Sequence, residues 1–360
     1  MAEPKKTLIL AGGTGGHIFP GLALAEALKA RGEGVYWLGS QASMEAERVP
    51  QAGIAFYGLP VKGLRGKGRL SLLLAPWRLL TCLFLALAYL RRIRPDQVVG
   101  FGGFASGPGG LAAWLLRIPL SIHEQNALPG FTNRCLAPLS RHVFTAFPQV
   151  LQKHRPIWVG NPVRHTLLQL PPPEQRYAER EGPLRLLVVG GSLGAQVLNE
   201  QLPAALALLA PEARPVVRHQ TGRGKLASTQ AAYQQLDGAT QVEVTEFIED
   251  MGAALAWADL VICRAGALTL AEMMAVGVAS ILVPYPFAVD DHQTHNARYL
   301  ADQQAALLVP QNQLKASQLA QWLGQDAASW RLELQAQAQC ARALAKTQAT
   351  EDMILELERH

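Results

Sequence analysis

A glycine-rich turn, GGTGGH at residues 12–17, follows the first apolar run of the sequence, LIL at residues 8–10, and precedes a helical pattern at residues 21–30. Glycines let a backbone approach a ligand closely, and the N–H groups of a helix start favour an anion or an electron-rich oxygen. The turn therefore predicts a phosphate or sugar site, with a plain tight turn as the alternative. Its spacing is not the dinucleotide fingerprint GxGxxG, and no acidic residue ends the next predicted strand, VYWLGS.

Two more polar or glycine-rich segments follow predicted strands in the first half of the chain. The segment GFGGFASGP, residues 100–108, is a second glycine-rich turn between a strand and a helix. The segment HEQN, residues 123–126, places four polar side chains at the end of the strand PLSI. Ligands of open parallel sheets bind at the carboxyl ends of the strands, so both segments are candidates for the same site as the first turn.

The second half contains the most specific sequence, ICRAGALTLAEMMAVG at residues 262–277. It predicts a buried strand, a small-residue turn at residues 265–267 and a helix that begins near Leu268, with Glu272 on the same helical face. A carboxylate there can accept hydrogen bonds from both hydroxyls of a ribose. The alternative is a glutamate that only stabilises the helix start. Downstream, PYPFAVDDHQTHNA at residues 284–297 is typical of a binding loop, with polar side chains at Asp290, Asp291, His292, Gln293 and Asn296.

The elements that must position these residues alternate between strands and helices. Strands are predicted at 7–10, 35–38, 97–101, 119–123 and 142–147, with helices at 21–30, 71–92 and 107–116. A break at Val159–Arg164 and a proline-rich, charged segment at 170–183 predict a linker. The pattern restarts at Arg185 with a strand and the turn GGSLG, and further strands are predicted at 215–220, 241–246, 260–263, 280–283 and 305–309. This order predicts an α/β fold with two Rossmann-like, doubly wound parallel-sheet domains that face each other across a cleft.

Length and composition agree with two globular domains. The chain has 360 residues, which exceeds the size at which a single core usually stops growing, and 49% of them are hydrophobic. The four cysteines, scattered at 82, 135, 263 and 340, show no zinc or disulfide spacing, so we expect a reducing compartment. The start MAEPKK leads directly into a predicted core strand, and we expect no signal peptide. The net charge of +5 suits an anionic surface without identifying one.

The most apolar stretch, residues 70–90, approaches the length of a membrane span. Pro76 and Arg78 within it argue against a span. Basic residues gather around it, at Lys62, Arg65, Lys67, Arg69, Arg78, Arg91, Arg92 and Arg94. The stretch therefore predicts a helix that partly covers the core and partly enters the interface of an anionic membrane. An ordinary buried helix is the alternative.

Eight motifs occur in the order and at the rough spacing of the MurG family, and the chain resembles that family over nearly its whole length. They are GGTGGHIFPGLALA, GFGGFASGP, HEQN, GNPVR, GGSLGAQ, TEFIEDM, CRAGALTLAE and DDHQTHNA. The family comprises peripheral bacterial enzymes that transfer N-acetylglucosamine from its UDP ester to lipid I and so make lipid II for peptidoglycan. The resemblance implies the GT-B fold, with an acceptor and membrane-associated domain at 1–162, a donor-binding domain at 163–340 and a last helix at about 341–360 that packs back on the first domain.

The resemblance also implies roles for individual residues. Thr14, Gly15 and Gly16 would lie near the donor sugar and its phosphates, and Asn126 and Gln293 would contact the N-acetylglucosamine. Arg164 and Ser192 would reach the diphosphate or nucleotide, and the backbone of Ile248 would read uracil. The segment from Ala267 to Glu272, with Leu268, Thr269, Leu270 and Ala271 between them, would hold sugar, phosphate and ribose, and Glu272 would accept the ribose hydroxyls.

The implied reaction is one inverting displacement in which the 4-hydroxyl of the acceptor sugar attacks C1 and UDP departs. The sequence lacks an Asp-x-Asp motif, so we expect neither a metal nor another cofactor to assist the departing diphosphate. His17 is the predicted catalytic base, because a helix N-terminus favours the neutral imidazole. Glu124 is its rival, and a helix-capping role is the alternative for His17. The expected partners are UDP-N-acetylglucosamine, undecaprenyl-linked lipid I and the anionic cytoplasmic face of the inner membrane, without nucleic acid.

Two other functions remain open at this point. A UDP-N-acetylglucosamine 2-epimerase shares the architecture and the donor, but it does not need the apolar stretch with basic flanks at residues 62–94. A membrane-docked sensor of sugar nucleotides, without catalysis, would keep the C-terminal motifs and would have no use for His17, HEQN or the turn at Gly100. The presence of these features in the sequence favours the transferase.

Overall fold

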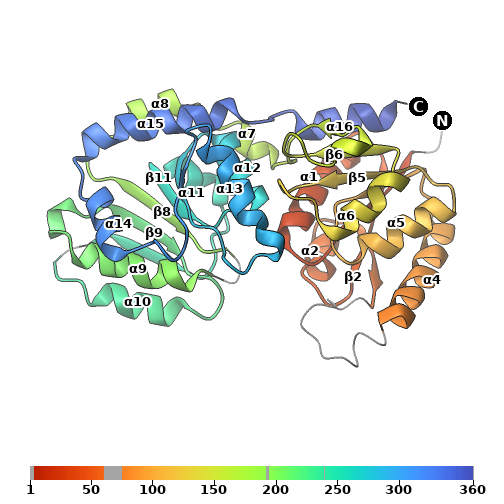
Figure 1. Ribbon diagram of the computed structural model, residues 1–360, viewed down its shortest axis with the longest axis horizontal. Coiled ribbons are helices and arrows are strands. Elements are labelled where there is room, and N and C mark those ends of the chain that lie inside the picture. Colours follow the sequence, from red (N-terminus) through yellow and green to blue (C-terminus); the bar gives the residue numbers. More distant parts are fainter. Residues whose placement is uncertain (1–3, 61–74, 192–193, 239, 360) are drawn as a thin grey trace. The chain divides into compact units, whose positions relative to one another are not determined.

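The computed structural model describes residues 4–60, 75–191, 194–238 and 240–359, and the chain in it divides into two compact units. Unit 1 comprises Met1–Val163 and Lys346–His360, and unit 2 comprises Arg164–Ala345. Each unit has a parallel sheet with helices packed on it (Figure 1). The predicted fold class of two Rossmann-like parallel-sheet domains is therefore confirmed.

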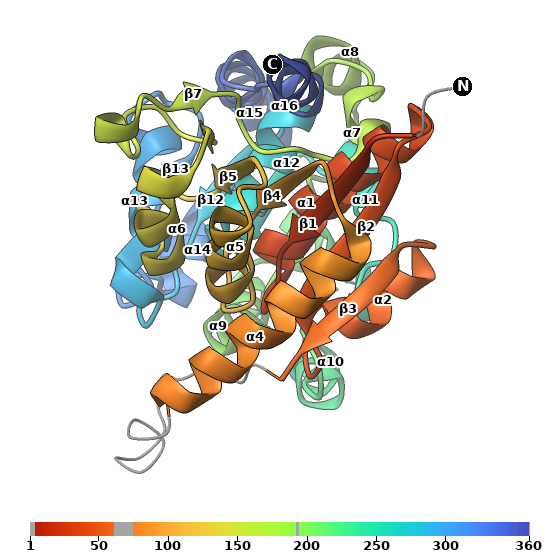
Figure 2. The ribbon, with the colours of Figure 1, turned by 90° about the vertical axis from the view of Figure 1, so that its right-hand side faces the viewer.

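The described part of unit 1 forms a seven-stranded sheet in the order β3-β2-β1-β4-β5-β6-β7 (Figure 2). Its strands are β1 Lys6–Leu10, β2 Gly34–Ser40, β3 Ala55–Leu59, β4 Gln97–Gly100, β5 Leu120–Glu124, β6 His142–Thr145 and β7 Ile157–Trp158. Its helices include α1 Gly15–Ala30, α2 Glu45–Gln51, α4 Ala75–Ile93, α5 Ser106–Leu115, α6 Phe131–Leu136 and α16 Ala349–Glu358. The strand order changes direction between β1 and β4, the position where doubly wound sheets bind ligands.

Alternate residues of the central strand β1 enter two different cores. Ile9 joins a cluster with Ile18 and Leu24 of α1 and with Met353 of α16. Leu8 and Leu10 join the cluster formed with α4 and α5. Because successive side chains of a strand point to opposite faces, both faces of the sheet are covered. This double cover explains why LIL reads as an unbroken apolar run.

The described part of unit 2 forms a six-stranded parallel sheet in the order β10-β9-β8-β11-β12-β13. Its strands are β8 Arg185–Val189, β9 Val216–Gln220, β10 Val242–Thr245, β11 Leu260–Cys263, β12 Ala279–Leu282 and β13 Leu307–Leu308. Its helices include α7 His165–Leu168, α8 Pro173–Ala178, α9 Gln196–Ala207, α10 Leu226–Gln234, α11 Met251–Trp257, α12 Ala267–Val276, α13 His292–Ala301, α14 Ala316–Leu323 and α15 Ala327–Ala343.

The predicted linker at residues 170–183 is wrong, because this segment contains α8 and is packed into unit 2. Tyr177 is buried, and its hydroxyl donates a hydrogen bond to the carbonyl oxygen of Asp259 at 2.5 Å. Arg180 forms an ion pair with the carboxylate of Asp259, while Arg176 donates to the carbonyl oxygens of Val276 and Gly277. The proline-rich, charged composition is typical of a linker and does not indicate that these side chains anchor the segment.

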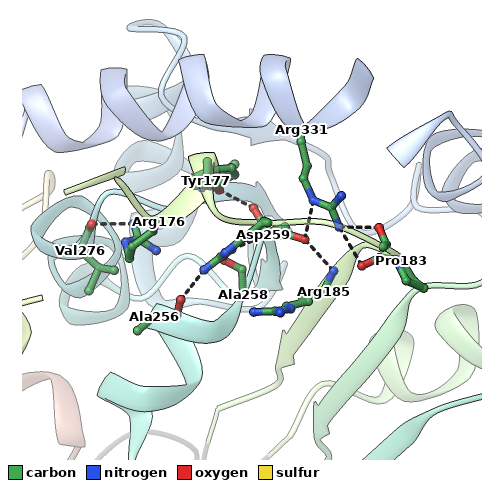
Figure 3. A network of polar contacts seen from close by, with 12 residues as sticks. Arg176, Tyr177, Pro183, Arg185, Ala256, Ala258, Asp259, Val276 and Arg331 are labelled. Carbon is green, nitrogen blue, oxygen red and sulfur yellow. Dashed lines mark hydrogen bonds and ion pairs between the residues drawn. The ribbon is translucent and has the colours of Figure 1, made fainter. Parts of the chain in front are cut away.

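Asp259 is the centre of this polar network (Figure 3). Its carboxylate is fully buried and accepts hydrogen bonds from the backbone N–H of Arg185 at 2.9 Å and from Nε of Arg331 at 3.2 Å. Arg331 also donates to the carbonyl oxygens of Gly182 and Pro183, both at 2.8 Å. A buried carboxylate that is paired and hydrogen-bonded in this way fixes α8 and α15 against the start of β8.

The apolar stretch forms α4, a helix of 19 residues whose described side chains are partly buried and partly exposed. Cys82, Ala86 and Leu90 pack into the core of unit 1, whereas Trp77 and Phe84 are 72% and 67% exposed. In the part of the chain that the structure describes, no helix has the length and apolar content that a membrane span requires. Residues 70–74 of the apolar stretch, and Lys62, Arg65, Lys67 and Arg69, lie outside the described residues.

Candidate active site

The first glycine turn leads directly into α1 and exposes its first residues. The backbone N–H groups of His17 and Ile18 donate to the carbonyl oxygen of Thr14, at 3.0 and 3.2 Å, which makes Thr14 the N-cap of the helix. Its side chain is exposed and makes no capping hydrogen bond. Gly15, Gly16 and His17 form the first helical turn and are half-buried. Thr14 to His17 are therefore available for contact at the positive end of the helix dipole.

A buried carboxylate, which the sequence did not reveal as a site residue, supports this turn. Glu45 of α2 is fully buried, and its Oε1 accepts hydrogen bonds from the backbone N–H of Ser40 at 2.8 Å and of Gly13 at 3.3 Å. A Cβ atom at Gly12 would lie only 2.4 Å from that oxygen. A side chain at position 12 would therefore displace the Glu45 carboxylate from its hydrogen bonds to Ser40 and Gly13.

The second glycine turn packs against the first. Gly102 and Gly103 both have positive φ angles, and a Cβ atom at Gly103 would lie 2.1 Å from the carbonyl oxygen of Gly12. The buried hydroxyl of Ser106 holds the two segments together, because it contacts the carbonyl oxygens of Leu10 at 2.9 Å and of Gly102 at 2.7 Å. A Cβ atom at Gly102 would lie 3.4 Å from the ring of His17. The two glycine-rich motifs thus form one surface beside His17.

The HEQN segment provides the polar contact of the His17 ring. Nδ1 of His17 lies 2.9 Å from Oε1 of Gln125, whose side chain is almost completely buried. Nε2 of Gln125 lies 3.1 Å from Nδ1 of His123 and 3.0 Å from the carbonyl oxygen of His123. His123 is fully buried, its Nε2 lies 2.8 Å from the carbonyl oxygen of Gly160, and burial lowers its pKa to about 4. His123 is therefore neutral at neutral pH.

Glu124 is turned into the protein instead. Its Oε2 accepts hydrogen bonds from the backbone N–H of Gly130 at 3.0 Å and from Nδ2 of Asn133 at 2.8 Å. Its Oε1 accepts from the backbone N–H of Asn126 at 3.0 Å and from Nδ2 of the same residue at 3.3 Å. Only 1% of Glu124 is exposed. This geometry suits a residue that shapes the loop after β5 and holds the side chain of Asn126.

In unit 2 the glycine turn after β8 approaches the end of β9. Gly194 has a positive φ angle, and a Cβ atom there would lie 2.0 Å from the carbonyl oxygen of Thr221. The buried Asn199 of α9 donates from Nδ2 to the same oxygen at 3.1 Å. Ser192, predicted to reach the nucleotide, lies outside the described residues.

Two predicted binding residues of unit 2, Arg164 at the N-cap of α7 and Glu272 on α12, form an ion pair. Nη2 of Arg164 lies 2.8 Å from Oε1 of Glu272, with the arginine side chain 44% exposed and the glutamate side chain 12% exposed. Burial raises the pKa of Glu272 above its ordinary value, and the positive charge of Arg164 partly opposes that rise. The predicted glutamate thus lies on α12, and Arg164 is its ion-pair partner.

The remaining residues of the donor motif lie on α12 and near its start. The helix begins at Ala267, one residue before the predicted start, with Gly266 as its N-cap, so Ala267, Leu268, Thr269, Leu270 and Ala271 precede Glu272 on the same helix. Leu270 is fully buried, and Ala267 and Ala271 are nearly so. Leu270 therefore has no exposed surface for a ligand, and Ala267 and Ala271 have little.

The DDHQTHNA segment forms the start of α13 and lies beside the turn before α12. The fully buried Asn296 donates from Nδ2 to the carbonyl oxygen of Ala265 at 3.3 Å. Oε1 of Gln293 accepts from the backbone N–H of Tyr285 at 2.9 Å, which orients its amide. Arg264 stacks on the Tyr285 ring, with 5.4 Å between its guanidinium carbon and the ring centroid. Ile248 is half-buried in the loop after β10, where Asp250 caps α11.

The described residues hold no group of three or more His, Cys, Asp or Glu side chains that could bind a metal ion. Cations and helix N-termini are the groups that they offer to a negative charge. Arg164 and the start of α12 provide them in unit 2, and the start of α1 provides them in unit 1.

Family models match both halves of the chain. The glycosyltransferase family 28 N-terminal domain matches residues 7–145, and the glycosyltransferase family 28 C-terminal domain matches residues 185–353. The fold and the site thus define a glycosyltransferase with two Rossmann-like domains.

Comparison with individual proteins gives a narrower assignment. The chain is 52% identical over 355 residues to the UDP-N-acetylglucosamine--N-acetylmuramyl-(pentapeptide) pyrophosphoryl-undecaprenol N-acetylglucosamine transferase of Marinobacter nauticus, covering 97% of this chain and 96% of that protein. It is 54% identical over 342 residues to the protein of the same name from Alkalilimnicola ehrlichii, with 95% of both chains covered. The crystal structure of Acinetobacter baumannii MurG superposes with a TM-score of 0.83 at 40% identity, over 99% of this chain and 100% of that one. The chain belongs to the MurG family.

The alternative enzyme class shares only the fold. A UDP-N-acetylglucosamine 2-epimerase from Neisseria meningitidis, solved bound to UDP-N-acetylglucosamine, superposes with a TM-score of 0.68 at 12% identity over 99% of this chain and 100% of that one. This similarity carries no information about the reaction of the present chain.

Proposed function

We propose that this protein transfers N-acetylglucosamine from UDP-N-acetylglucosamine to the 4-hydroxyl of the muramoyl sugar of lipid I and thereby forms lipid II. Full-length relatives about half identical to this chain are named for that transfer. The structural observation that carries the proposal is His17, in the first turn of α1, with Nδ1 of its ring near both Gly102 and Gln125. A base in this position suits the removal of a proton from an acceptor hydroxyl.

The donor is held chiefly by unit 2 in this proposal. Glu272 accepts the two ribose hydroxyls, while the backbone at the start of α12 meets the sugar and its phosphates. Arg164 and Ser192 reach the diphosphate or nucleotide, and the backbone of Ile248 reads the uracil. The side-chain oxygen of Gln293 accepts from the backbone N–H of Tyr285, and its amide nitrogen donates to the N-acetylglucosamine. Thr14, Gly15, Gly16 and Asn126 of unit 1 contact the sugar end of the donor.

The reaction needs one displacement. The acceptor O4 forms a bond to C1 of the N-acetylglucosamine while the bond from C1 to the diphosphate oxygen breaks, so the α linkage becomes β. His17 takes the proton of the hydroxyl, and UDP carries away the electron pair. The charge that develops on the diphosphate is stabilised by Arg164 and by helix N-termini, and no covalent intermediate on the protein is required.

The protein acts at the cytoplasmic face of the inner membrane in this proposal, bound peripherally through α4 and α5. Trp77 and Phe84 of α4 are exposed, as are Trp114 and Leu115 of α5, and the two helices lie next to each other in unit 1. Arg91 and Arg92 follow in the last turn of α4. Exposed aromatic residues flanked by arginines are typical of a surface that binds anionic lipid.

The test is incubation with UDP-N-acetylglucosamine and a lipid I analogue, followed by detection of a disaccharide product and UDP. We expect His17→Ala to lower kcat about 10²- to 10⁴-fold while UDP still binds, as is typical for loss of a general base. Glu124→Gln is the comparison variant, and its effect is expected on folding stability and KM. A His17→Ala enzyme with kcat within a few-fold of wild type would refute the role of His17. Epimerisation of the donor without transfer would refute the proposed reaction.

A further inference from the structure

The hydrogen-bond chain behind His17 determines which nitrogen of its ring carries the proton. The chain runs from His17 through Gln125 and His123 to the carbonyl oxygen of Gly160, all within unit 1. Each link joins a donor to an acceptor. The proton positions can therefore be deduced by starting from the end of the chain that can only accept a hydrogen bond.

The fixed end is the carbonyl oxygen of Gly160, which only accepts hydrogen bonds. Nε2 of His123 lies 2.8 Å from it and must carry a proton. Because burial lowers the pKa of His123 to about 4, the ring is neutral at neutral pH and has only that one N–H. Nδ1 of His123 is consequently an acceptor.

The amide of Gln125 is oriented by two acceptors on His123. Its nitrogen lies 3.1 Å from Nδ1 of His123 and 3.0 Å from the carbonyl oxygen of the same residue. An amide oxygen at that position would face two hydrogen-bond acceptors and would be repelled, so the NH₂ group must lie there. The amide oxygen of Gln125 then faces His17.

Nδ1 of His17 lies 2.9 Å from this amide oxygen, which only accepts. The neutral His17 ring must therefore carry its proton on Nδ1, and the lone pair is left on Nε2. We infer that Gln125 is a positioning residue that holds His17 in the Nδ1–H tautomer, so that Nε2 is the atom that accepts the proton of the acceptor hydroxyl. The second half of this inference depends on the proposed function, and the first half does not.

The neutral amide of Gln125 acts on His17 differently from a carboxylate in the same place. A carboxylate beside Nδ1 stabilises the protonated imidazole, whereas a neutral amide oxygen fixes the tautomer without adding a negative charge. Gln125 cannot take up the proton itself. The hydrogen-bond chain therefore orients the base without placing a negative charge beside it.

The direct test is nitrogen NMR of protein labelled with ¹⁵N-histidine, with the His17 signals assigned by their loss in His17→Ala. We expect the neutral His17 ring of the wild-type protein to show a protonated Nδ1 and an unprotonated Nε2. A protonated Nε2 in the wild type would overturn the inference, whatever the kinetics show. This measurement needs neither substrate nor activity, so it is independent of the proposed reaction.

Kinetics of Gln125→Met test the consequence for the reaction. We expect kcat to fall at least tenfold with little change in the KM for UDP-N-acetylglucosamine, and the Nδ1–H tautomer to lose its dominance. Gln97→Met is the matched control, because Gln97 of β4 is also a buried glutamine of unit 1 and its amide donates to Thr7 instead. We expect the control to keep wild-type kcat and the His17 signals.

Gln125→Glu separates orientation from charge. It keeps an acceptor for Nδ1–H but adds a negative charge, so we expect more activity than in Gln125→Met and an acidic limb of the kcat/KM profile that moves to higher pH. Wild-type kcat in Gln125→Met, with the tautomer lost, would overturn the positioning role while leaving His17 as the base. The positioning role would also be overturned if His17→Ala lost transfer activity while both Gln125 variants kept wild-type kcat.

Discussion

In the proposed donor site, Arg164 opposes the protonation of Glu272. The carboxyl group is nearly buried, which raises its pKa, and the guanidinium at 2.8 Å opposes that rise. An ionised carboxylate accepts hydrogen bonds on both oxygens, whereas a protonated one is a donor on one oxygen. We therefore expect Arg164 to support nucleotide binding through Glu272, in addition to any direct contact with phosphate.

UDP binding to Glu272 variants tests this arrangement. We expect Glu272→Ala to weaken UDP binding by about 10- to 100-fold, the cost of losing a charged acceptor of two hydrogen bonds. Calorimetry on the folded variant measures it, with Glu174→Ala, an exposed glutamate of α8, as the control. In Arg164→Ala the affinity should begin to fall at a higher pH than in the wild type, because the pKa of Glu272 rises further. Unchanged UDP affinity in Glu272→Ala would exclude the role.

At the scale of elements, strands with strong apolar runs could be predicted and weakly marked ones could not. Strand β11 begins and ends at the predicted residues, Leu260 and Cys263, because both faces of a central parallel strand are buried. The sequence does not predict strands β3 and β7, since AFYGL is only half-buried at the sheet edge and IW has two residues. It predicts a linker in place of helix α8, because the prolines at the start of this helix are typical of linkers.

The candidate site shows the same limit. The glycine turns and HEQN could be located because strand ends carry their own sequence signature. The support of the first glycine turn by Glu45 could not be predicted, because Glu45 lies on α2, 32 residues away in sequence from the Gly13 that it contacts. Nor could the inward orientation of Glu124 be distinguished from that of a cleft-facing carboxylate, since neighbouring residues at the end of a strand differ only in which side they face.

The exposed apolar surface of α4 and α5 leads to a prediction about lipid. Trp77, Leu80 and Phe84 follow the i, i+3, i+7 spacing of one helical face, and all three are exposed. Trp77→Ser with Phe84→Ser, or Arg91→Glu with Arg92→Glu, should reduce binding to vesicles that contain anionic lipid, by about 1 kcal/mol for each arginine. Turnover of a short, water-soluble acceptor should survive.

Sedimentation with vesicles measures the binding, and Leu332→Ser is the matched control because Leu332 is 70% exposed on α15 of unit 2. Vesicle binding that is equal in all variants would mean that this face of α4 and α5 does not meet the membrane. Lys67 and Arg69, which the sequence also placed in this surface, lie outside the described residues.

At the scale of the whole molecule, each unit buries one neutral histidine near the end of a strand. His123 ends its chain at Gly160 in unit 1. In unit 2, His219 lies 2.7 Å from the hydroxyl of Tyr233 and 3.0 Å from Oδ1 of Asn199, which in turn donates to Thr221. Burial lowers the pKa of both histidines from 6.5 to about 4. The groups that hold the strand ends are thus sensitive to acid.

The sign of this linkage follows from which state binds the proton. The unfolded chain protonates these histidines near pH 6.5, while the folded chain keeps them neutral down to about pH 4. The stability that they contribute is therefore complete above pH 6.5 and is lost as the pH falls from 6.5 to about 4, by about 3 kcal/mol for each histidine over that whole range.

We expect His219→Gln to be less stable than the wild type at about pH 7.5. The difference in unfolding free energy between the two should narrow by roughly 2 kcal/mol at about pH 5, because glutamine cannot titrate. Urea denaturation at both pH values measures the difference, with His165→Gln, at an exposed histidine of α7, as the control variant. A difference between wild type and His219→Gln that stays constant or widens on acidification would mean that His219 does not remain neutral in the folded protein.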